Sequence, residues 1–222
     1  MKVIGICGVK KSGKSEVAKE IEKMYVGTKV VRLPFASIIK QIMANFVSSV
    51  TNIQYNDALE LFNNPDKKEL IIKEIGTSPR VLMTSFGTDF ARKLNPNIWV
   101  NAINNTINKL NQLTYTHIAN NGTIVHSANN DIVIIIDDVR FENELSFLRS
   151  INADIVFVAR NFETLKPSPL VKMIMYFKIL FGKMHISEKG LYHLISYTDI
   201  VIVNKGTLLE LNEKVNVLCK KK

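Results

Sequence analysis

Five runs of apolar, mostly β-branched residues recur along the chain between polar stretches. They are Val3–Cys7, Lys29–Leu33, Ile132–Ile136, Asp154–Val158 and Asp199–Val203. Short apolar runs of this kind are typical of strands that are buried on both faces of a sheet. Segments of helical periodicity separate them, since Val17, Ile21 and Met24 fall on one face of a helix that follows the first run. Strands that alternate with helices predict an α/β fold with a parallel five-stranded sheet.

Local signals mark two further elements. Ser78-Pro79 supplies an N-cap and a first-turn proline, which predicts a helix that runs towards Leu94. Asn121-Gly122 is a type I′ turn signal, so we expect a β-hairpin insertion at about 114–130. A two-residue turn there would place His117 opposite His126, but we do not expect a metal site because no carboxylate or cysteine stands at ligand spacing.

The composition describes one globular domain, 1–222, with 46% hydrophobic and 22% charged residues. A net charge of +9 suits polyanionic ligands, which include both nucleic acids and phosphate-rich small molecules. Two cysteines do not indicate a disulfide framework, so we expect a reducing, cytoplasmic compartment. The apolar stretch 170–181 is interrupted by Lys172 and Lys178 and is too short to cross a bilayer, so no membrane is expected.

The segment from Gly8 to Ser15 reads G-V-K-K-S-G-K-S and fits the phosphate-binding loop pattern G-x-x-x-x-G-K-S. It lies between the first predicted strand and an amphipathic helix, which is where the mechanism needs it. Glycines let backbone N–H groups turn towards a β-phosphate at a helix N-terminus. Lys14 would reach the β and γ oxygens, and the Ser15 hydroxyl could ligate Mg²⁺. The sequence therefore predicts a P-loop that binds ATP.

Asp137 and Asp138 follow the buried run Ile132–Ile136. Carboxylates at the carboxyl end of such a strand face the phosphate site in a parallel sheet, so either aspartate could hold Mg²⁺. The alternative is a structural aspartate that caps a turn or helix. We take Asp138 as the candidate metal ligand.

A guanine-nucleotide switch is a competing use of a P-loop. Asn204-Lys205-Gly206-Thr207 superficially resembles its N-K-x-D element, but Thr207 stands where the aspartate that pairs with guanine is required. No D-x-x-G follows the second carboxylate strand either, because Val139-Arg140-Phe141 come after Asp138. The sequence therefore lacks both elements that define a GTPase.

Four segments together resemble the deoxynucleoside monophosphate kinases of bacteriophages. They are Gly8 to Ser15, Gly87-Thr88-Asp89-Phe90-Ala91-Arg92 with Asn95 to Val100 after it, Asp138-Val139-Arg140-Phe141-Glu142-Asn143-Glu144, and His185-Ile186-Ser187-Glu188. The resemblance implies an adenylate-kinase-like P-loop sandwich of three layers, with acceptor-binding helices at about 35–100 and a lid at about 160–188. It also implies ATP, Mg²⁺, a deoxynucleoside monophosphate acceptor, a homodimer and a viral setting in the host cytoplasm. The start of the acceptor helices, Phe35 to Lys40, carries Ser37 where the family commonly has an aspartate.

Phosphoryl transfer needs fixed cations around the spread negative charge, and arginine grips phosphate oxygens with a planar fork. Arg92, Arg140 and Arg160 are the candidates, although each could instead make a structural contact at the end of its element. Trp99 and Phe35 could stack on the acceptor or pack in the core.

We expect the catalytic residues to be Lys14, Arg92, Asp138 and Arg140. The candidate cofactor-binding set is Gly8, Lys11, Ser12, Gly13, Lys14, Ser15, Glu16 and Arg160, with Ser15 and Asp138 on the metal. The candidate substrate-binding set is Phe35, Lys40, Asp89, Arg92, Trp99, Arg140 and Glu144.

Two rival functions share part of this pattern. Phosphomevalonate kinases and dephospho-coenzyme A kinases also carry the P-loop, but the Gly87–Arg92 and Asp138–Glu144 motifs favour a nucleotide acceptor. A P-loop ATPase that binds nucleic acid would suit the net charge. The chain lacks a basic stripe interleaved with aromatic residues, so we expect no stable nucleic-acid partner.

Overall fold

The computed structural model describes residues 1–112, 114–118, 124–128, 132–160, 194–195 and 198–220, with side chains for all of these except 114–118, 124–128 and 217–220. These residues form two compact units. The first consists of Met1–Pro34 and Ile107–Lys222, and the second is Phe35–Thr106. The helices predicted to bind the acceptor, at about 35–100, fall within the second unit.

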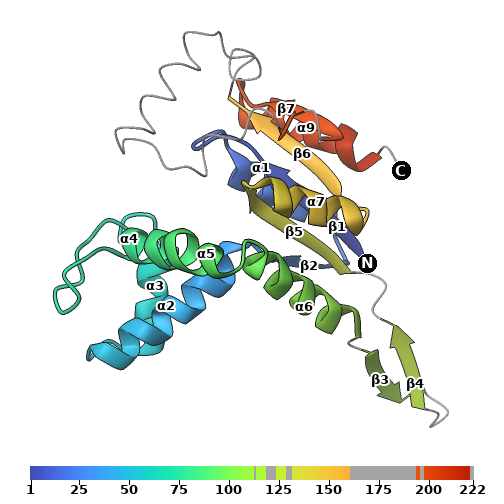
Figure 1. The fold of residues 1–222 in the computed structure, drawn as a ribbon. Helices are drawn as coiled ribbons and strands as arrows, with labels where there is room; N and C mark the ends of the chain where they lie inside the picture. The colour runs from blue at the N-terminus through green and yellow to red at the C-terminus, as the bar shows by residue number, and fades with distance from the viewer. Residues whose placement is uncertain (113, 119–123, 129–131, 161–193, 196–197, 221–222) are drawn as a thin grey trace. The chain divides into compact units, whose positions relative to one another are not determined.

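A parallel five-stranded sheet forms the centre of the first unit, as the sequence predicted (Figure 1). Its order is β2-β5-β1-β6-β7, and the strands are β1 (Lys2–Cys7), β2 (Lys29–Arg32), β5 (Ile132–Val139), β6 (Asp154–Ala159) and β7 (Ile200–Val203). Strand β1 pairs with β5 on one side and with β6 on the other. The loop after β1 is therefore flanked by the carboxyl ends of two neighbouring strands, which is where ligands bind in open α/β sheets.

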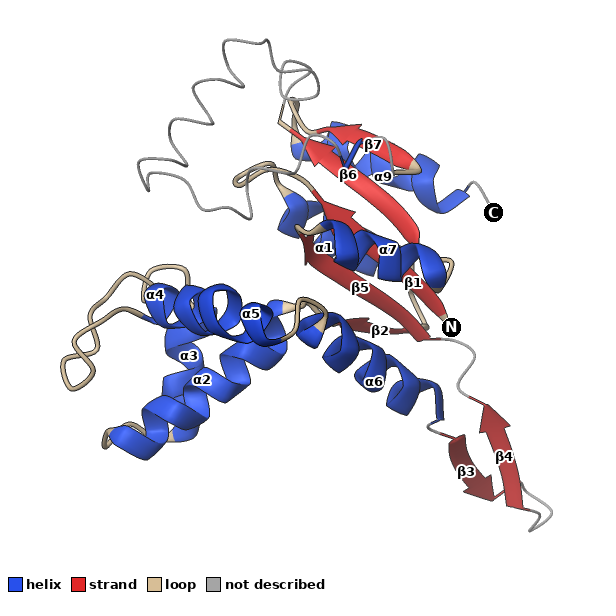
Figure 2. Cartoon of the chain, in the orientation of Figure 1, coloured by secondary structure: helices blue, strands red, loops and turns tan. Residues whose placement is uncertain are grey.

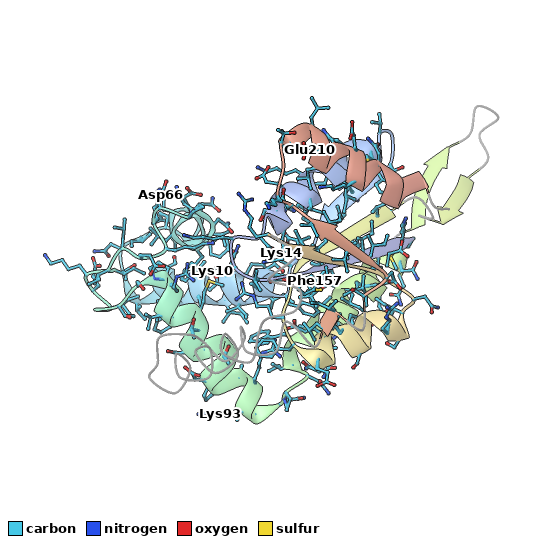
Figure 3. All side chains as sticks on the ribbon, turned by 90° about the horizontal axis from the view of Figure 1, so that it is seen from above. Lys10, Lys14, Asp66, Lys93, Phe157 and Glu210 are labelled. Atoms are coloured by element: carbon cyan, nitrogen blue, oxygen red, sulfur yellow. The ribbon has the colours of Figure 1, made fainter. Side chains whose placement is uncertain are left out.

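Helices cover both faces of this sheet, which confirms the predicted three-layer sandwich (Figure 2). Helices α1 (Lys14–Met24) and α9 (Leu208–Lys220) pack on the face that carries Ile4 and Ile6. Helix α7 (Glu142–Ser150) packs on the opposite face, where a Cβ added to Gly5 would lie 2.5 Å from Leu148 Cδ1. Burial follows this arrangement, since Phe157 of β6 is fully buried and Glu210 of α9 is exposed (Figure 3). In the second unit, Asp66 and Lys93 are exposed.

The second unit is helical. It contains α2 (Ala36–Val50), α3 (Tyr55–Asn63), α4 (Pro79–Thr84), the π-helix η1 (Ser85–Ala91), α5 (Arg92–Leu94) and the first turns of α6 (Ile98–Gln112). Its core is built from α2 and α3, with Met43, Val47 and Phe62 among the buried side chains.

The helix predicted to start at Pro79 is confirmed, and the Ser78 hydroxyl accepts a hydrogen bond from the backbone N–H of Val81 at 3.4 Å. It is not one regular α-helix, however. The hydrogen-bonding pattern widens to that of a π-helix over Ser85–Ala91 before Arg92. Periodicity did not reveal this change, because a short π-helical segment differs from an α-helix only by one residue in the spacing of its hydrogen bonds.

The hairpin insertion is confirmed as β3 (Thr114–Ile118) paired antiparallel with β4 (Ile124–Ala128). Its predicted register is wrong. Thr116 pairs with His126 and His117 with Val125, so the two histidines are not directly opposite. The reason is the connection: residues 119–123 separate the paired strands, whereas the predicted register required a two-residue turn.

Most of the predicted lid at 160–188, including His185, Glu188 and the apolar stretch 170–181, lies outside the described residues. Within the described part of the chain, none of the helices is apolar over a length sufficient to cross a bilayer.

Candidate active site

The P-loop, Gly8–Ser15, connects β1 to α1, and its path requires glycine at two positions. Gly8 has φ +146°, and a Cβ there would lie 2.2 Å from the carbonyl oxygen of Val158 in β6. Gly13 has φ +96°, and a Cβ there would lie 2.1 Å from Nδ2 of Asn204. A side chain at either position would strain the backbone and collide with a neighbouring strand end. The loop is therefore packed directly against the ends of β6 and β7.

Lys14 is the first residue of α1, and its side chain folds back over the loop. Its Nζ donates hydrogen bonds to the carbonyl oxygens of Gly8 at 2.8 Å and Val9 at 2.9 Å. Burial and the guanidinium of Arg140 lower the pKa of Lys14, while the carboxylates of Asp137 and Asp138 act in the opposite direction. These four charged groups thus act on one another at the carboxyl end of the sheet.

The hydroxyl of Ser12 is fully buried in the P-loop. Among the described residues, its Oγ has no hydrogen-bond partner. Buried hydroxyl groups are nearly always satisfied, so such an atom marks a place where a ligand or a water completes the structure. The orphaned Ser12 hydroxyl and the positive end of the α1 dipole together make the loop suited to an anion.

Asn204, directly after β7, holds the P-loop from the other side. Its Nδ2 donates a hydrogen bond to the backbone carbonyl of Ser12 at 3.1 Å, and its own backbone N–H donates to Ala159 at 2.8 Å. The side chain is buried. We did not identify Asn204 from the sequence as a site residue. The available signal was a polar residue directly after a buried strand that ends at the edge where the P-loop lies.

A bulge at the end of β5 carries the two aspartates. Gly5 pairs with Ile136 and Cys7 with Val139, so Asp137 and Asp138 both stand opposite one residue of β1. Bulges of this kind change the direction of side chains and are frequent next to active sites. Both aspartates are half-buried. In the described part of the chain no three His, Cys, Asp or Glu side chains form a potential metal cage.

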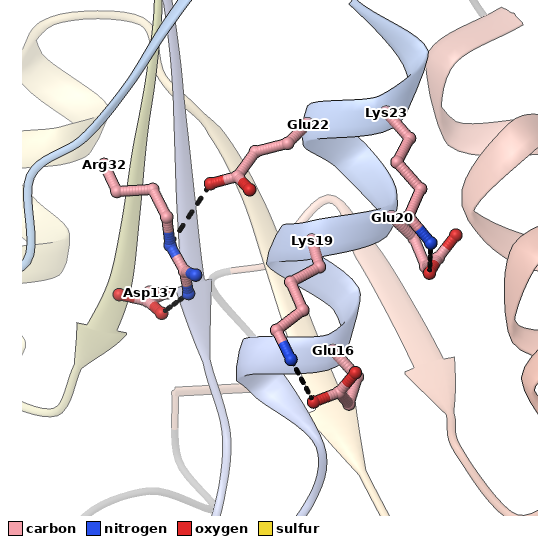
Figure 4. A network of polar contacts seen from close by, with 7 residues as sticks. All are labelled: Glu16, Lys19, Glu20, Glu22, Lys23, Arg32 and Asp137. Carbon is pink, nitrogen blue, oxygen red and sulfur yellow. Dashed lines mark hydrogen bonds and ion pairs between the residues drawn. The ribbon is translucent and has the colours of Figure 1, made fainter. Parts of the chain in front are cut away.

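Arg32, the last residue of β2, forms an ion pair with Asp137 (Figure 4). The same guanidinium contacts Glu22 of α1, with 3.3 Å between Arg32 Nε and Glu22 Oε1. Asp137 therefore has a fixed cationic partner across the sheet. The sequence reasoning missed Arg32, because its proximity to Asp137 follows from the pairing of β2 with β5.

Glu144 is almost fully buried near the start of α7. Its Oε2 accepts hydrogen bonds from the backbone N–H groups of Arg140 at 2.7 Å and Phe141 at 3.1 Å. A carboxylate at the third helical position that binds N-cap amides stabilises the helix start. Glu144 thus fixes the turn that carries the exposed Arg140, and its carboxylate is used for that purpose in the structure.

In the second unit, Phe35 and Trp99 are both buried. The indole Nε1 of Trp99 donates a hydrogen bond to the carbonyl oxygen of Gly87 at 2.8 Å, and its ring lies 6.0 Å from that of Phe86. Of the two alternatives for Trp99, the structure shows packing within the second unit.

The other candidates of the second unit are more accessible. Asp89 is exposed in η1, and the half-buried Arg92 follows it, with Nη1 at 3.4 Å from the carbonyl oxygen of Pro96. The Nζ of Lys40 donates a hydrogen bond to Asn63 Oδ1 at 3.0 Å. Asp89 and Arg92 belong to one continuous helical segment, while Lys40 belongs to α2.

The remaining candidates lie on the surface of the first unit. Lys11, which adopts a left-handed φ of 63°, and Ser15 are exposed, and so is Arg160, directly after β6. Glu16 forms an ion pair with Lys19 at 3.1 Å (Figure 4). Ser15 immediately follows Lys14, so its hydroxyl belongs to the first turn of α1.

Cys7 lies directly before the P-loop but is suited to packing rather than chemistry. Burial raises the pKa of its thiol to about 12, and Sγ donates a 3.5 Å hydrogen bond to the carbonyl oxygen of Val156. A neutral, buried thiol is a poor nucleophile.

Comparison with known proteins adds one assignment. The model of a family described as deoxynucleotide monophosphate kinase matches residues 45–215. No curated protein matches the chain. Similar solved structures include a dephospho-CoA kinase from Campylobacter jejuni, with 14% identity, coverage of 100% of this chain and 97% of that chain, and a TM-score of 0.48. A shikimate kinase from Aquifex aeolicus shows 15% identity, coverage of 99% and 96%, and a TM-score of 0.45. At TM-scores this low, the likenesses support no inference about the substrate.

The contact between Asn204 and the P-loop predicts a specific defect. Asn204→Asp replaces the amide donor by an oxygen that repels the Ser12 carbonyl, so ATP binding should weaken by about tenfold or more. Isothermal titration calorimetry measures the affinity. Thr207→Ala is the matched control: the Thr207 hydroxyl accepts a 3.3 Å hydrogen bond from the backbone N–H of Glu210 in the first turn of α9, so its loss affects the start of that helix and not the Ser12 carbonyl. Equal ATP affinity in the two variants would show that the Asn204 contact does not shape the loop.

Proposed function

The chain belongs to the deoxynucleotide monophosphate kinase family, and we propose that it transfers the γ-phosphoryl group of ATP, bound with Mg²⁺, to a deoxynucleoside monophosphate. Membership of the family makes the protein a phosphotransferase with a small-molecule nucleotide substrate. The observation that supports the proposed donor most directly is the P-loop, in which Lys14 lies across the carbonyl oxygens of Gly8 and Val9 at the N-terminus of α1.

The donor phosphates would lie against the P-loop. Backbone N–H groups at the start of α1 and the buried Ser12 hydroxyl would donate to phosphate oxygens. Lys14 would exchange its two carbonyl partners for β and γ oxygens, which places its positive charge where negative charge accumulates during transfer. In the reaction, the bond between the γ-phosphorus and the bridging oxygen of ADP breaks, and a bond to a phosphate oxygen of the acceptor forms.

A hydroxyl and a carboxylate at the edge of the sheet fit a magnesium ion. Mg²⁺ prefers oxygen ligands and is usually held by one or two protein groups together with substrate phosphates. We assign Ser15 and Asp138 to this role, because Ser15 stands in the first turn of α1 beside Lys14 and Asp138 stands in the bulge near the carboxyl end of β5. When bound, the ion would neutralise charge on the β and γ oxygens.

Two arginines would serve the acceptor and the transferring group. Arg140 extends from the turn that Glu144 fixes, and its guanidinium is close enough to Lys14 to lower the pKa of that lysine. We assign it to the transferring phosphoryl group. Arg92, with Asp89 before it, is assigned to the acceptor phosphate, and Lys11, Glu16 and Arg160 to the donor side. Phe35 and Lys40 would shape the acceptor pocket, and the buried Trp99 would support it from within the second unit.

The assembly and cellular setting are also part of the proposal. The resemblance to phage enzymes supports a homodimer and a role in the host cytoplasm, and the absence of a nucleic-acid motif in the sequence supports a free nucleotide as substrate. Light scattering of the purified protein measures the mass of the assembly, and a monomer at all concentrations would exclude the dimer.

A panel of acceptors tests the function. With ATP and Mg²⁺, the purified protein should phosphorylate at least one deoxynucleoside monophosphate faster than phosphomevalonate or dephospho-coenzyme A, as measured by chromatography of the products.

Lys14→Ala should lower kcat by about a hundredfold or more, because it removes a charge that stabilises the transition state. Circular dichroism checks that the variant is folded. Turnover close to that of the wild type in a folded Lys14→Ala protein would refute the role of Lys14.

The two aspartates should differ in their effect on metal. Asp138→Asn should raise the Mg²⁺ concentration needed for half-maximal activity by about tenfold or more, since a metal ligand loses its charge. Asp137→Asn is the matched control, and it should mainly lower stability because it leaves Arg32 without that partner. Electron paramagnetic resonance of Mn²⁺ with ATP reports metal binding independently of turnover. A larger loss of Mn²⁺ binding in Asp137→Asn than in Asp138→Asn would reverse the assignment.

A further inference from the structure

The motif that carries Asp89 and Arg92 lies in an unusual backbone conformation. Residues Ser85–Ala91 form the π-helix η1, which joins α4 to α5 within one continuous helical segment. π-Helical segments are rare and often occur at functional sites, because they cost stability and persist where an altered geometry is useful. A change of one residue in helical register rotates the side chains that follow by about 100°. The π-helical register therefore sets the direction in which Arg92 points.

Trp99 reaches back to the middle of this segment. Its Nε1 donates a hydrogen bond to the carbonyl oxygen of Gly87 at 2.8 Å, and the contact is buried. Indole has a single donor, and a buried N–H without an acceptor is costly, so this bond favours the backbone position in which the Gly87 carbonyl faces Trp99. The hydrogen bond from Trp99 to Gly87 links the two ends of the segment 87–99, and Arg92 lies between them.

Packing holds the same point of the π-helix from a second direction. Gly87 is buried, and a Cβ there would lie 2.8 Å from Cδ1 of Ile39 in α2. The Phe86 ring lies 6.0 Å from the Trp99 ring and 5.9 Å from the Phe90 ring. The backbone at Gly87 is thus confined between Ile39 and the indole of Trp99.

Hydrogen bonds also order the segment that connects Arg92 to Trp99. The backbone N–H of Asn95 donates to Ala91 at 3.1 Å, and that of Asn97 donates to the Asn95 side chain at 2.9 Å. Arg92 itself contacts the Pro96 carbonyl. A displacement of Trp99 would therefore be transmitted to both ends of the segment that carries Arg92.

We propose that Trp99 is a positioning residue for the acceptor site: its indole N–H fixes the π-helical register of Ser85–Ala91 and thereby aims Asp89 and Arg92, without touching the acceptor. This inference rests on the proposed role of Arg92 in binding the acceptor phosphate. It replaces stacking on the base as the function of the only tryptophan in the chain.

The test removes the indole N–H and keeps an aromatic ring at position 99. Trp99→Phe should raise the KM for the deoxynucleoside monophosphate by about tenfold, because a small misplacement of a phosphate-binding group is costly, while the KM for ATP stays within about twofold. Val100→Ala is the matched control. Val100 is buried on the same helix, so its truncation should lower the melting temperature without changing either KM.

Hydrogen exchange reports the π-helix without any substrate. Amides of Ser85–Arg92 should exchange faster in Trp99→Phe than in the wild type, and Val100→Ala should not show this local increase. If Trp99→Phe does not fold, 3-benzothienylalanine in place of Trp99 removes the N–H with nearly the same shape, and the same results are expected.

Each outcome is decisive. Unchanged exchange together with an unchanged acceptor KM would overturn the proposal, as would faster exchange with an unchanged acceptor KM, since the register would then not serve binding. Equal rises in the KM values for ATP and acceptor would indicate a general structural role and would also overturn it. A wild-type protein that phosphorylates no nucleotide would refute the proposed function and the role of Arg92 in binding the acceptor phosphate. The exchange data would still decide whether Trp99 stabilises the π-helix.

Discussion

The close approach of the P-loop backbone to the ends of β6 and β7 is the constraint on which the candidate active site depends. Gly8 leaves no space for a Cβ beside the Val158 carbonyl, and Gly13 leaves none beside the Asn204 amide. This packing is possible only because β1 lies at the centre of the parallel sheet, between β5 and β6. The sheet supports the loop from one side and the α1 N-terminus continues it from the other, so a flexible glycine-rich segment acquires a fixed shape.

Some charged side chains around the P-loop form ion pairs, and others act on the charge of Lys14. Arg32 neutralises Asp137 from β2 and also contacts Glu22 on α1, so three elements of the first unit meet at one guanidinium. Lys14 experiences Arg140 and both aspartates, and burial already disfavours its charged form. Adding the phosphates of a nucleotide would relieve the repulsion between Lys14 and Arg140. The features that favour an anion here are the buried cation of Lys14 and the N-terminus of α1.

In the second unit, a helical segment carries the polar residues Asp89 and Arg92. A regular α-helix would distribute Asp89 and Arg92 by its own periodicity, whereas the π-helical segment changes their direction. The buried contacts of Gly87 with Ile39 and Trp99 stabilise this less favourable backbone. Aromatic residues near a substrate motif are easily interpreted as stacking groups. Trp99 is buried and bonded to the Gly87 carbonyl, which supports the proposal that it orients the polar side chains from within the second unit.

The sequence by itself determined the elements and the type of chemistry. Apolar runs predicted the five strands, the Ser78-Pro79 signal located the start of a helix, and the G-x-x-x-x-G-K-S pattern located the phosphate loop, because each depends on neighbouring residues only. The tertiary structure decided which polar groups meet. Arg32 and Asp137 are 105 positions apart, and Asn204 and Ser12 are 192 apart, so their contacts follow from strand order and register. Glu144 was predicted to bind the substrate, and in the structure its carboxylate accepts hydrogen bonds from the backbone N–H groups of Arg140 and Phe141. The hairpin register differs from the one that its turn signal predicted. The physical reason is that propensity and spacing act along the chain, whereas burial and hydrogen-bond satisfaction depend on which distant backbone groups the folded sheet brings within reach.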